Sequence, residues 1–292
     1  MTTEARVNFL RTIGPKLEPG GRVIRGPCGI TTDESMNIYV AMAPVGWIAK
    51  LDQHGKYLMG IGFGEGKWYK KIGKLGGPAG VAVDKSGNIY AADIKLACIV
   101  MFDSQGHFLK KIGRGGSGDG EFKRPRSIHI DAAGCLWVVD AYNHRIQKLD
   151  PEGNPLFKFG SKGNKDGNFN NPYDLAFDQQ GCIYVTDCEN ARVQKFDPEG
   201  KYLFKFGNKG AGDDEIRNPR GIALDGEQRV YVADVWNQCV KVFDSMGGFL
   251  YSFNPQIKED DLVILYGITI TRAGTVLVTD NGDSRIVVYA LS

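Results

Sequence analysis

The sequence predicts an all-β fold built from repeated units of short strands. Of its 292 residues, 39 are glycine and 11% are aromatic, and glycine-rich turns combined with Val, Ile, Tyr and Phe favour many short strands. Four copies of one pattern begin 47 residues apart, at Pro78, Pro125, Pro172 and Pro219. A looser copy begins at Pro27 and a shortened copy near Leu265. A repeat of this length is typical of repeat architectures, and six copies are present.

Each copy predicts four short strands. In the copy that begins at Pro125 we expect strands at 126–130, 136–139, 145–149 and 156–159, separated by D-x-x-G turns and by a polar loop at 140–144. Such strands form an antiparallel meander. One meander cannot cover both of its own faces, whereas six around an axis cover one another. The sequence therefore predicts a six-bladed β-propeller with four antiparallel strands per blade, in a single domain over residues 1–292.

The two ends of the chain predict how the ring closes. The last copy ends after its third strand, at RIVVYALS, and has no fourth strand. The segment FLRTIG at 9–14 matches FLKKIG at 108–113, which is a fourth strand. We therefore expect the N-terminal strand to complete the last blade through backbone hydrogen bonds.

The third copy carries the residues of a known repeat. Its segment VVDAYNHRIQKLDPEG, at 138–153, resembles the NHL repeat, with Asn143-His144 five residues before Leu149. The resemblance covers nearly the whole chain and implies the six-bladed fold. Propellers of this family serve as RNA readers, protein-binding platforms, sensor domains and lyases, so the resemblance leaves the activity open.

Composition excludes a strong general attraction to nucleic acid or to a membrane surface, because the formal net charge is only +2. The N-terminus lacks the apolar core of a signal peptide, and no apolar run approaches a membrane span. None of the six cysteines forms a CxxC pair, so we expect reduced thiols that pack as small apolar side chains. We expect a soluble, monomeric, cytoplasmic protein that binds no membrane. A domain excised from a longer protein would have the same composition.

Long, variable loops mark one end of the predicted propeller as the end that binds ligands. These loops join blade to blade and the second strand of a blade to the third. The candidate ligand-binding residues at this end are Arg126, Tyr142, Asn143, Tyr173, Asp174, Asn190, Arg220, Trp236, Asn237 and Tyr266. The loops around Trp47 and Leu96 are largely apolar. This mixture favours an amphipathic ligand or a peptide over a uniform phosphate backbone.

Two residues differ from their counterparts in the other copies. Asp174 stands where four other copies have glycine, and its carboxylate either contacts a ligand or caps a local backbone N–H. His129 stands where the others have Thr or Ala, so its imidazole would project into the channel or between blades. The pairs Asp140–Arg145, Asp187–Arg192 and Asp280–Arg285 recur at one spacing and predict structural ion pairs. We see no metal-ligand cluster and expect no metal or cofactor.

The first hypothesis for function is recognition of RNA, of a protein or peptide, or of a small amphipathic molecule. NHL propellers of ubiquitin-ligase-type tripartite-motif proteins bind single-stranded or hairpin RNA at this end, and aromatic and arginine side chains suit that task. The residues that match such positions are Arg126, Tyr142, Tyr173, Arg220 and Trp236. The modest net charge and the nearby acids weigh against RNA, and a peptide needs the same anchors with less positive charge.

The second hypothesis is a small-molecule enzyme of lyase, isomerase or hydrolase type. The peptide-amidating lyase family is similar in one loop, where Tyr142 falls at the position of that family's catalytic tyrosine. That family's metal-binding histidines follow the leading proline, where this chain has no histidine. An acid–base site without metal stays open, with His129, Tyr142, Asp174 and Arg126 as candidate catalytic residues. The sequence favours binding over catalysis.

Overall fold

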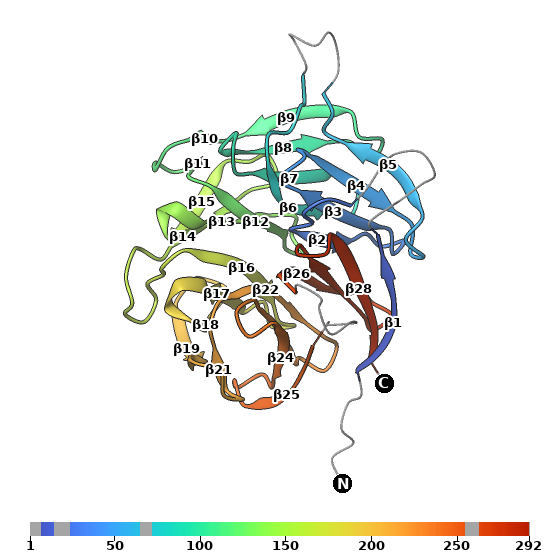
Figure 1. Cartoon of the computed structure of the whole chain (residues 1–292). Helices are drawn as coiled ribbons and strands as arrows, with labels where there is room; N and C mark the ends of the chain where they lie inside the picture. The colour runs from blue at the N-terminus through green and yellow to red at the C-terminus, as the bar shows by residue number, and fades with distance from the viewer. Residues whose placement is uncertain (1–6, 15–23, 65–71, 255–262, 292) are drawn as a thin grey trace.

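Six four-stranded antiparallel sheets surround a central axis in the computed structural model, which describes residues 7–14, 24–64, 72–254 and 263–291 (Figure 1). We call the sheets blades and give their strands from the innermost outwards. Blade 1 consists of β2 (Ile30–Thr32), β3 (Ile38–Met42), β4 (Trp47–Leu51) and β5 (Tyr57–Ile61), and blade 2 of β6 (Pro78–Val83), β7 (Ile89–Asp93), β8 (Cys98–Phe102) and β9 (Phe108–Ile112). Blade 3 consists of β12 (Pro125–Ile130), β13 (Leu136–Asp140), β14 (Arg145–Leu149) and β15 (Pro155–Phe159).

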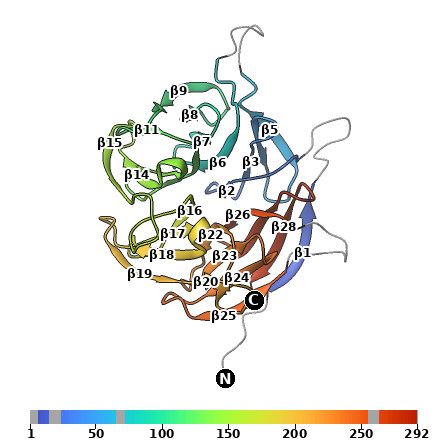
Figure 2. The ribbon, with the colours of Figure 1, turned by 60° about the vertical axis from the view of Figure 1, so that its left-hand side comes forward.

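Blades 4 to 6 repeat the same order. Blade 4 consists of β16 (Pro172–Phe177), β17 (Ile183–Asp187), β18 (Arg192–Phe196) and β19 (Tyr202–Phe206), and blade 5 of β22 (Pro219–Leu224), β23 (Val230–Asp234), β24 (Cys239–Phe243) and β25 (Phe249–Phe253). Blade 6 consists of β26 (Leu265–Ile270), β27 (Thr275–Asp280), β28 (Arg285–Leu291) and β1 (Val7–Ile13). The turned view places the innermost strands near the axis and the outermost strands at the rim (Figure 2). The predicted fold class is confirmed.

The ring closes as the sequence predicts. Strand β1 pairs antiparallel with β28, from Val7 opposite Leu291 to Ile13 opposite Ile286, with an irregularity between Phe9 and Arg11. Figure 1 shows the two ends of the chain side by side in this blade. Backbone hydrogen bonds between the two termini therefore hold the last blade together.

The predicted D-x-x-G turns have a common physical basis. In blade 3, Asp131 Oδ1 accepts hydrogen bonds from the backbone N–H groups of Ala133 and Cys135, at 3.0 and 2.9 Å. Its second oxygen accepts from Trp137 Nε1 at 2.9 Å, which ties the turn to the following strand. These contacts explain why the first five repeats place Asp at this point of the chain. The last repeat has Thr271 there, whose hydroxyl accepts from the backbone N–H of Thr275. Apolar clusters fill the space between neighbouring blades, and the second strand of each blade is buried.

The connections between blades contain structure that the repeat pattern does not predict. Short parallel pairs form between β10 (Arg114–Gly115) and β11 (Glu121–Phe122), and between β20 (Asn208–Lys209) and β21 (Glu215–Ile216). The polar loops 140–144 and 187–191 contain single 3-10 turns, η1 (Ala141–Asn143) and η2 (Cys188–Asn190).

The predicted ion pairs hold these connections in place. Arg145 Nε lies 2.8 Å from Asp140 Oδ2, and the equivalent distances are 2.7 Å for Arg192–Asp187 and 3.0 Å for Arg285–Asp280. All six cysteines are free thiols. Among the described residues, no helix has the length and apolar character needed to cross a membrane.

Candidate functional site

Four predicted ligand residues stack against one another at the loop-bearing mouth of the channel. They are Arg126, Tyr173, Arg220 and Tyr266. They lie near the start of the innermost strands of blades 3 to 6, each directly after the leading proline of its strand or the equivalent residue. The guanidinium carbon of Arg126 lies 4.8 Å from the centre of the Tyr173 ring, and that of Arg220 lies 4.0 Å from the centre of the Tyr266 ring. The two tyrosine rings meet edge to face at 6.0 Å. Cation–π contact therefore organises the mouth.

No acid among the described residues balances these two cations. Neither Arg126 nor Arg220 forms an ion pair there, and Arg220 donates from Nε to Asn218 Oδ1 at 3.1 Å. Arg126 Nε and Arg220 Nη1 are buried without an acceptor. Burying a charge without a partner is costly. The mouth therefore carries two positive charges that no acid among the described residues pairs with.

Tyr173, Cys188 and Cys28 lie near the two arginines and are neutral near pH 7. Burial raises the pKa of Tyr173 well above its ordinary value, although Arg126 and Arg220 act to lower it. Burial raises the pKa of Cys188 to about 11 and also raises the pKa of Cys28. Phenol and thiols thus keep their protons and leave the guanidinium charges uncompensated.

The three predicted asparagines are part of the loop framework. Each donates its amide N–H groups to the buried aspartate three residues earlier and to a carbonyl of the preceding blade connection: Asn143 to Asp140 and Gly116, Asn190 to Asp187 and Gly163, Asn237 to Asp234 and Gly210. Their amide nitrogens are therefore occupied. A role in ligand contact stays a prediction and would fall to their side-chain oxygens.

Tyr142 and Trp236 lie on the rim. Tyr142 is 40% exposed, and its hydroxyl accepts a hydrogen bond from Arg124 Nη1 at 2.7 Å while the guanidinium covers its ring. Trp236 is 60% exposed. Sequence reasoning missed Arg124, which precedes the strand-leading proline, because nothing in the spacing relates that position to Tyr142.

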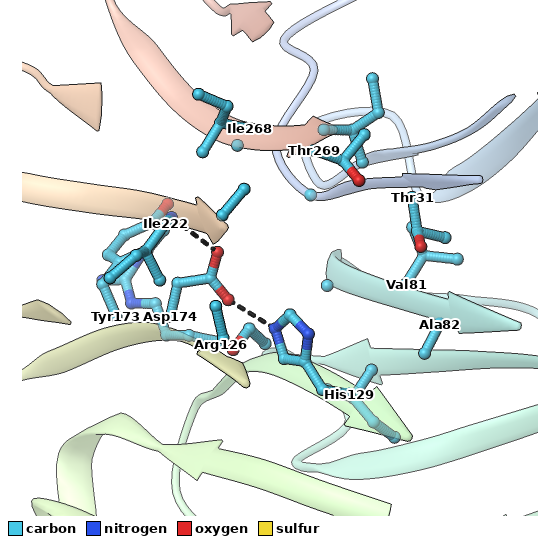
Figure 3. A pocket seen from close by; sticks show the side chains of 18 of the residues that line it. Thr31, Val81, Ala82, Arg126, His129, Tyr173, Asp174, Ile222, Ile268 and Thr269 are labelled. Carbon is cyan, nitrogen blue, oxygen red and sulfur yellow. Dashed lines mark hydrogen bonds and ion pairs between the residues drawn. The ribbon is translucent and has the colours of Figure 1, made fainter. Parts of the chain in front are cut away.

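Asp174 and His129 meet inside the channel, one blade apart (Figure 3). His129 Nε2 lies 2.7 Å from Asp174 Oδ1, and the side chains are 32% and 13% exposed. Asp174 also accepts from the backbone N–H groups of Leu175 at 2.9 Å and Ile222 at 3.3 Å. The carboxylate therefore both caps backbone and orients the imidazole. Of the four candidate catalytic residues, this pair is in contact, whereas Tyr142 and Arg126 have the other partners described above.

The repeats match known families. The NHL repeat family matches residues 169–196 and 217–243, and a family described as a 6-bladed beta-propeller matches residues 75–158. The chain is a six-bladed β-propeller, and two of its segments match the NHL repeat. No protein among those with curated descriptions matches its sequence significantly.

Solved structures share the fold of this propeller at low sequence identity. A gluconolactonase from Xanthomonas campestris is 17% identical over 99% of this chain and 91% of its own, with a TM-score of 0.71. A catalytically inactive virginiamycin B lyase from Staphylococcus aureus, solved with quinupristin, is 14% identical over 99% and 100%, with a TM-score of 0.66. A Bacteroides thetaiotaomicron protein of unknown function is 15% identical over 99% and 77%, with a TM-score of 0.69. These likenesses concern the fold alone.

Proposed function

We propose that this NHL propeller is a recognition module that binds an acidic peptide segment of a partner protein at the loop-bearing mouth of its channel. One observation carries the proposal. Arg126 and Arg220 are partly buried cations that pack on tyrosine rings and have no acidic partner among the described residues. A carboxylate of a ligand would supply the missing charge, and guanidinium groups suit carboxylates because they donate two parallel hydrogen bonds.

The rim of the mouth adds positive charge around this pair. Its cationic side chains are Lys95, Lys123, Arg124 and Arg217. The two acids of the same rim already have partners, since Glu189 accepts from Asn171 and Asp283 pairs with Arg285. The cations of the rim outnumber its acids, and an excess of one charge sign attracts and orients ligands of the other sign.

The aromatic rings favour a peptide over RNA. RNA readers of this kind stack bases on free aromatic faces. Here guanidinium groups lie over the rings of Tyr142, Tyr173 and Tyr266. The apolar loop around Leu96 lies on the same end of the propeller and suits an apolar side chain beside the acid. A peptide with both residue types fits these features.

The test is isothermal titration calorimetry with a short acetylated peptide of Glu-Glu-Leu repeats. A Gln-Gln-Leu peptide is the neutral control, and a single-stranded uridine oligomer tests the RNA alternative. We expect the glutamate peptide to bind, and Arg126→Met or Arg220→Met to weaken binding by at least about tenfold, because each removes a partly buried charge contact.

The matched control is Arg217→Met, which removes an exposed cation from the same end. We expect it to change affinity by less than about threefold, because exposed ion pairs contribute little. Thermal unfolding of each variant checks that the fold survives. Equal binding of the two peptides, preference for the uridine oligomer, or equal losses in Arg126→Met and Arg217→Met would overturn the proposal.

Catalysis is the second candidate, and the His129–Asp174 pair favours it. A carboxylate that holds one imidazole nitrogen prepares the other to accept a proton. Two of the solved structures with this fold are named as a gluconolactonase and a lyase. If this chain is an enzyme, His129→Ala should abolish turnover while the thermal unfolding midpoint is kept; turnover that survives the substitution would exclude His129 as the base.

A further inference from the structure

The channel contains a chamber that is continuous with the mouth. It has a volume of about 280 Å³, and Arg126, Tyr173 and Tyr266 line it at its mouth end. Two residues after the leading proline or its counterpart, four repeats have glycine, and a Cβ there would meet the backbone of the next blade. At Gly80 it would lie 2.7 Å from Ser127 Cα, and at Gly221 it would lie 2.8 Å from the backbone nitrogen of Ile268. Neighbouring innermost strands therefore touch at this level.

The chamber is reached from the end of the propeller that carries the D-x-x-G turns. Its far rim consists of the last residues of innermost strands, and the same residues line two hollows on the turn-bearing end. The shared rim residues are Thr31, Val83, Ile130, Phe177, Leu224, Thr269 and Ile270. A small molecule can thus approach the chamber from this end as well as from the mouth.

His129 presents a hydrogen-bond acceptor to this chamber. A carboxylate accepts hydrogen bonds, so the nitrogen that faces Asp174, Nε2, carries the proton of the neutral imidazole. Nδ1 then bears a lone pair, and it has no hydrogen-bond partner among the described residues. Figure 3 shows the ring with one nitrogen bonded to Asp174 and the other turned away from it.

Around His129 the walls are apolar side chains and hydroxyl groups, whereas Arg126, Ser127 and Tyr173 line the part nearest the mouth. Val81, Ala82 and Ile268 line the chamber, and Thr31 and Thr269 lie across it from His129 in Figure 3. Neither threonine hydroxyl has a hydrogen-bond partner among the described residues. An apolar cavity with a few convergent polar groups is the usual form of a small-molecule site.

We propose that this chamber is a second ligand site, which takes a small, largely apolar molecule with one hydroxyl group that donates a hydrogen bond to His129 Nδ1. Asp174 is a positioning residue, because it fixes the tautomer and the orientation of the imidazole. The volume of about 280 Å³ suits a single ring better than a drug-sized ligand. The inference is independent of the acidic-peptide function proposed for the mouth.

The test is ¹⁹F NMR with two probes of nearly equal shape. 4-Fluorophenol can donate a hydrogen bond from its hydroxyl group, and 4-fluoroanisole cannot. We expect saturable line broadening of 4-fluorophenol by the wild-type protein and binding of 4-fluoroanisole at least about tenfold weaker, because the partly buried acceptor is left unpaired. His129→Ala should remove the difference between the probes, and His129→Gln, which keeps an acceptor, should restore part of it.

A second His–Asp pair in the chain supplies the matched control. His107 Nδ1 lies 3.0 Å from Asp103 Oδ2, but this pair is on the surface, with His107 66% exposed. His107→Ala should leave 4-fluorophenol binding unchanged. Equal binding of the two probes, an equal loss in His107→Ala, or displacement of 4-fluorophenol by the Glu-Glu-Leu peptide would overturn the proposal. Displacement by the peptide would assign the phenol to the mouth.

Discussion

The blade connections and the channel mouth use the same side chain in opposite ways. In the connections, Arg145 and Arg192 are buried, and each donates to an aspartate and to three backbone carbonyls. At the mouth, Arg126 and Arg220 pack on tyrosine rings and have no acid. The first pair completes the fold from within the chain. The second pair has no acidic partner among the described residues, and this difference separates framework from candidate site.

Arg145→Met is the substitution with the largest expected effect. It removes four hydrogen bonds and leaves Asp140, which is fully buried, without its cation. Burial already raises the pKa of Asp140, and the guanidinium is one of the groups that act to lower it. Breaking a buried pair costs about 3–5 kcal/mol, so the free energy of unfolding from urea titration should fall by that amount.

Arg126→Met is the comparison that tests the distinction. Removing an unbalanced charge and keeping an apolar side chain of similar length should change the free energy of unfolding by less than about 1 kcal/mol. Similar losses of unfolding free energy in Arg126→Met and Arg145→Met would mean that both arginines stabilise the fold. The main argument for a ligand at the mouth would then fail.

The framework could be predicted from the sequence because it repeats. The leading prolines, the D-x-x-G turns and the Asp–Arg pairs recur at fixed spacing, so six blades, their strand bounds within about one residue and the closing strand all follow. The mouth could be predicted only in part. Arg126, Tyr173, Arg220 and Tyr266 were found because they hold equivalent positions, but their mutual stacking depends on how adjacent blades rotate about the axis.

The pairing of His129 with Asp174 illustrates what spacing cannot supply. Both residues were recognised as departures from the repeat, yet they stand at different positions in adjacent strands, 45 residues apart. Their contact follows from the stagger of β12 against β16. For the asparagines, the repeat pattern found the residues but did not reveal their role. Asn143, Asn190 and Asn237 hold one equivalent position, and each donates a hydrogen bond to the loop aspartate three residues earlier.

Gly221→Ala tests how closely the mouth depends on the contact between neighbouring innermost strands. The added methyl group would lie 2.8 Å from both the backbone nitrogen of Ile268 and the carbonyl oxygen of Tyr266, and neither atom can move without its strand. Overpacking of this kind costs about 1–3 kcal/mol. Gly226→Ala is the control, because nothing lies within 4 Å of its Cβ position. Urea titration that gives equal unfolding free energies for the two variants would show that the strands are not in close contact.

The smallest expected effect concerns His144, at the boundary between the two regions. Its Nδ1 accepts a hydrogen bond from the backbone N–H of Asn171 at 3.1 Å, so the neutral ring links two blades. Burial, with Lys162 adding to it, holds the pKa of His144 below its ordinary value of 6.5. As the pH falls below 6.5, the unfolded chain therefore takes up a proton more readily than the folded chain. The stabilising contribution is complete above pH 6.5 and is lost below it.

The variant His144→Gln isolates this contribution, because blade 5 has Gln238 at the equivalent position with the same left-handed backbone, φ 55° against 54°. The wild-type protein should lose more unfolding free energy than the variant between about pH 7.5 and pH 5, as measured by urea titration at each pH. Parallel pH profiles would mean that His144 takes up its proton equally in both states. The link between blades 3 and 4 would then be insensitive to pH, and the boundary would belong wholly to the framework.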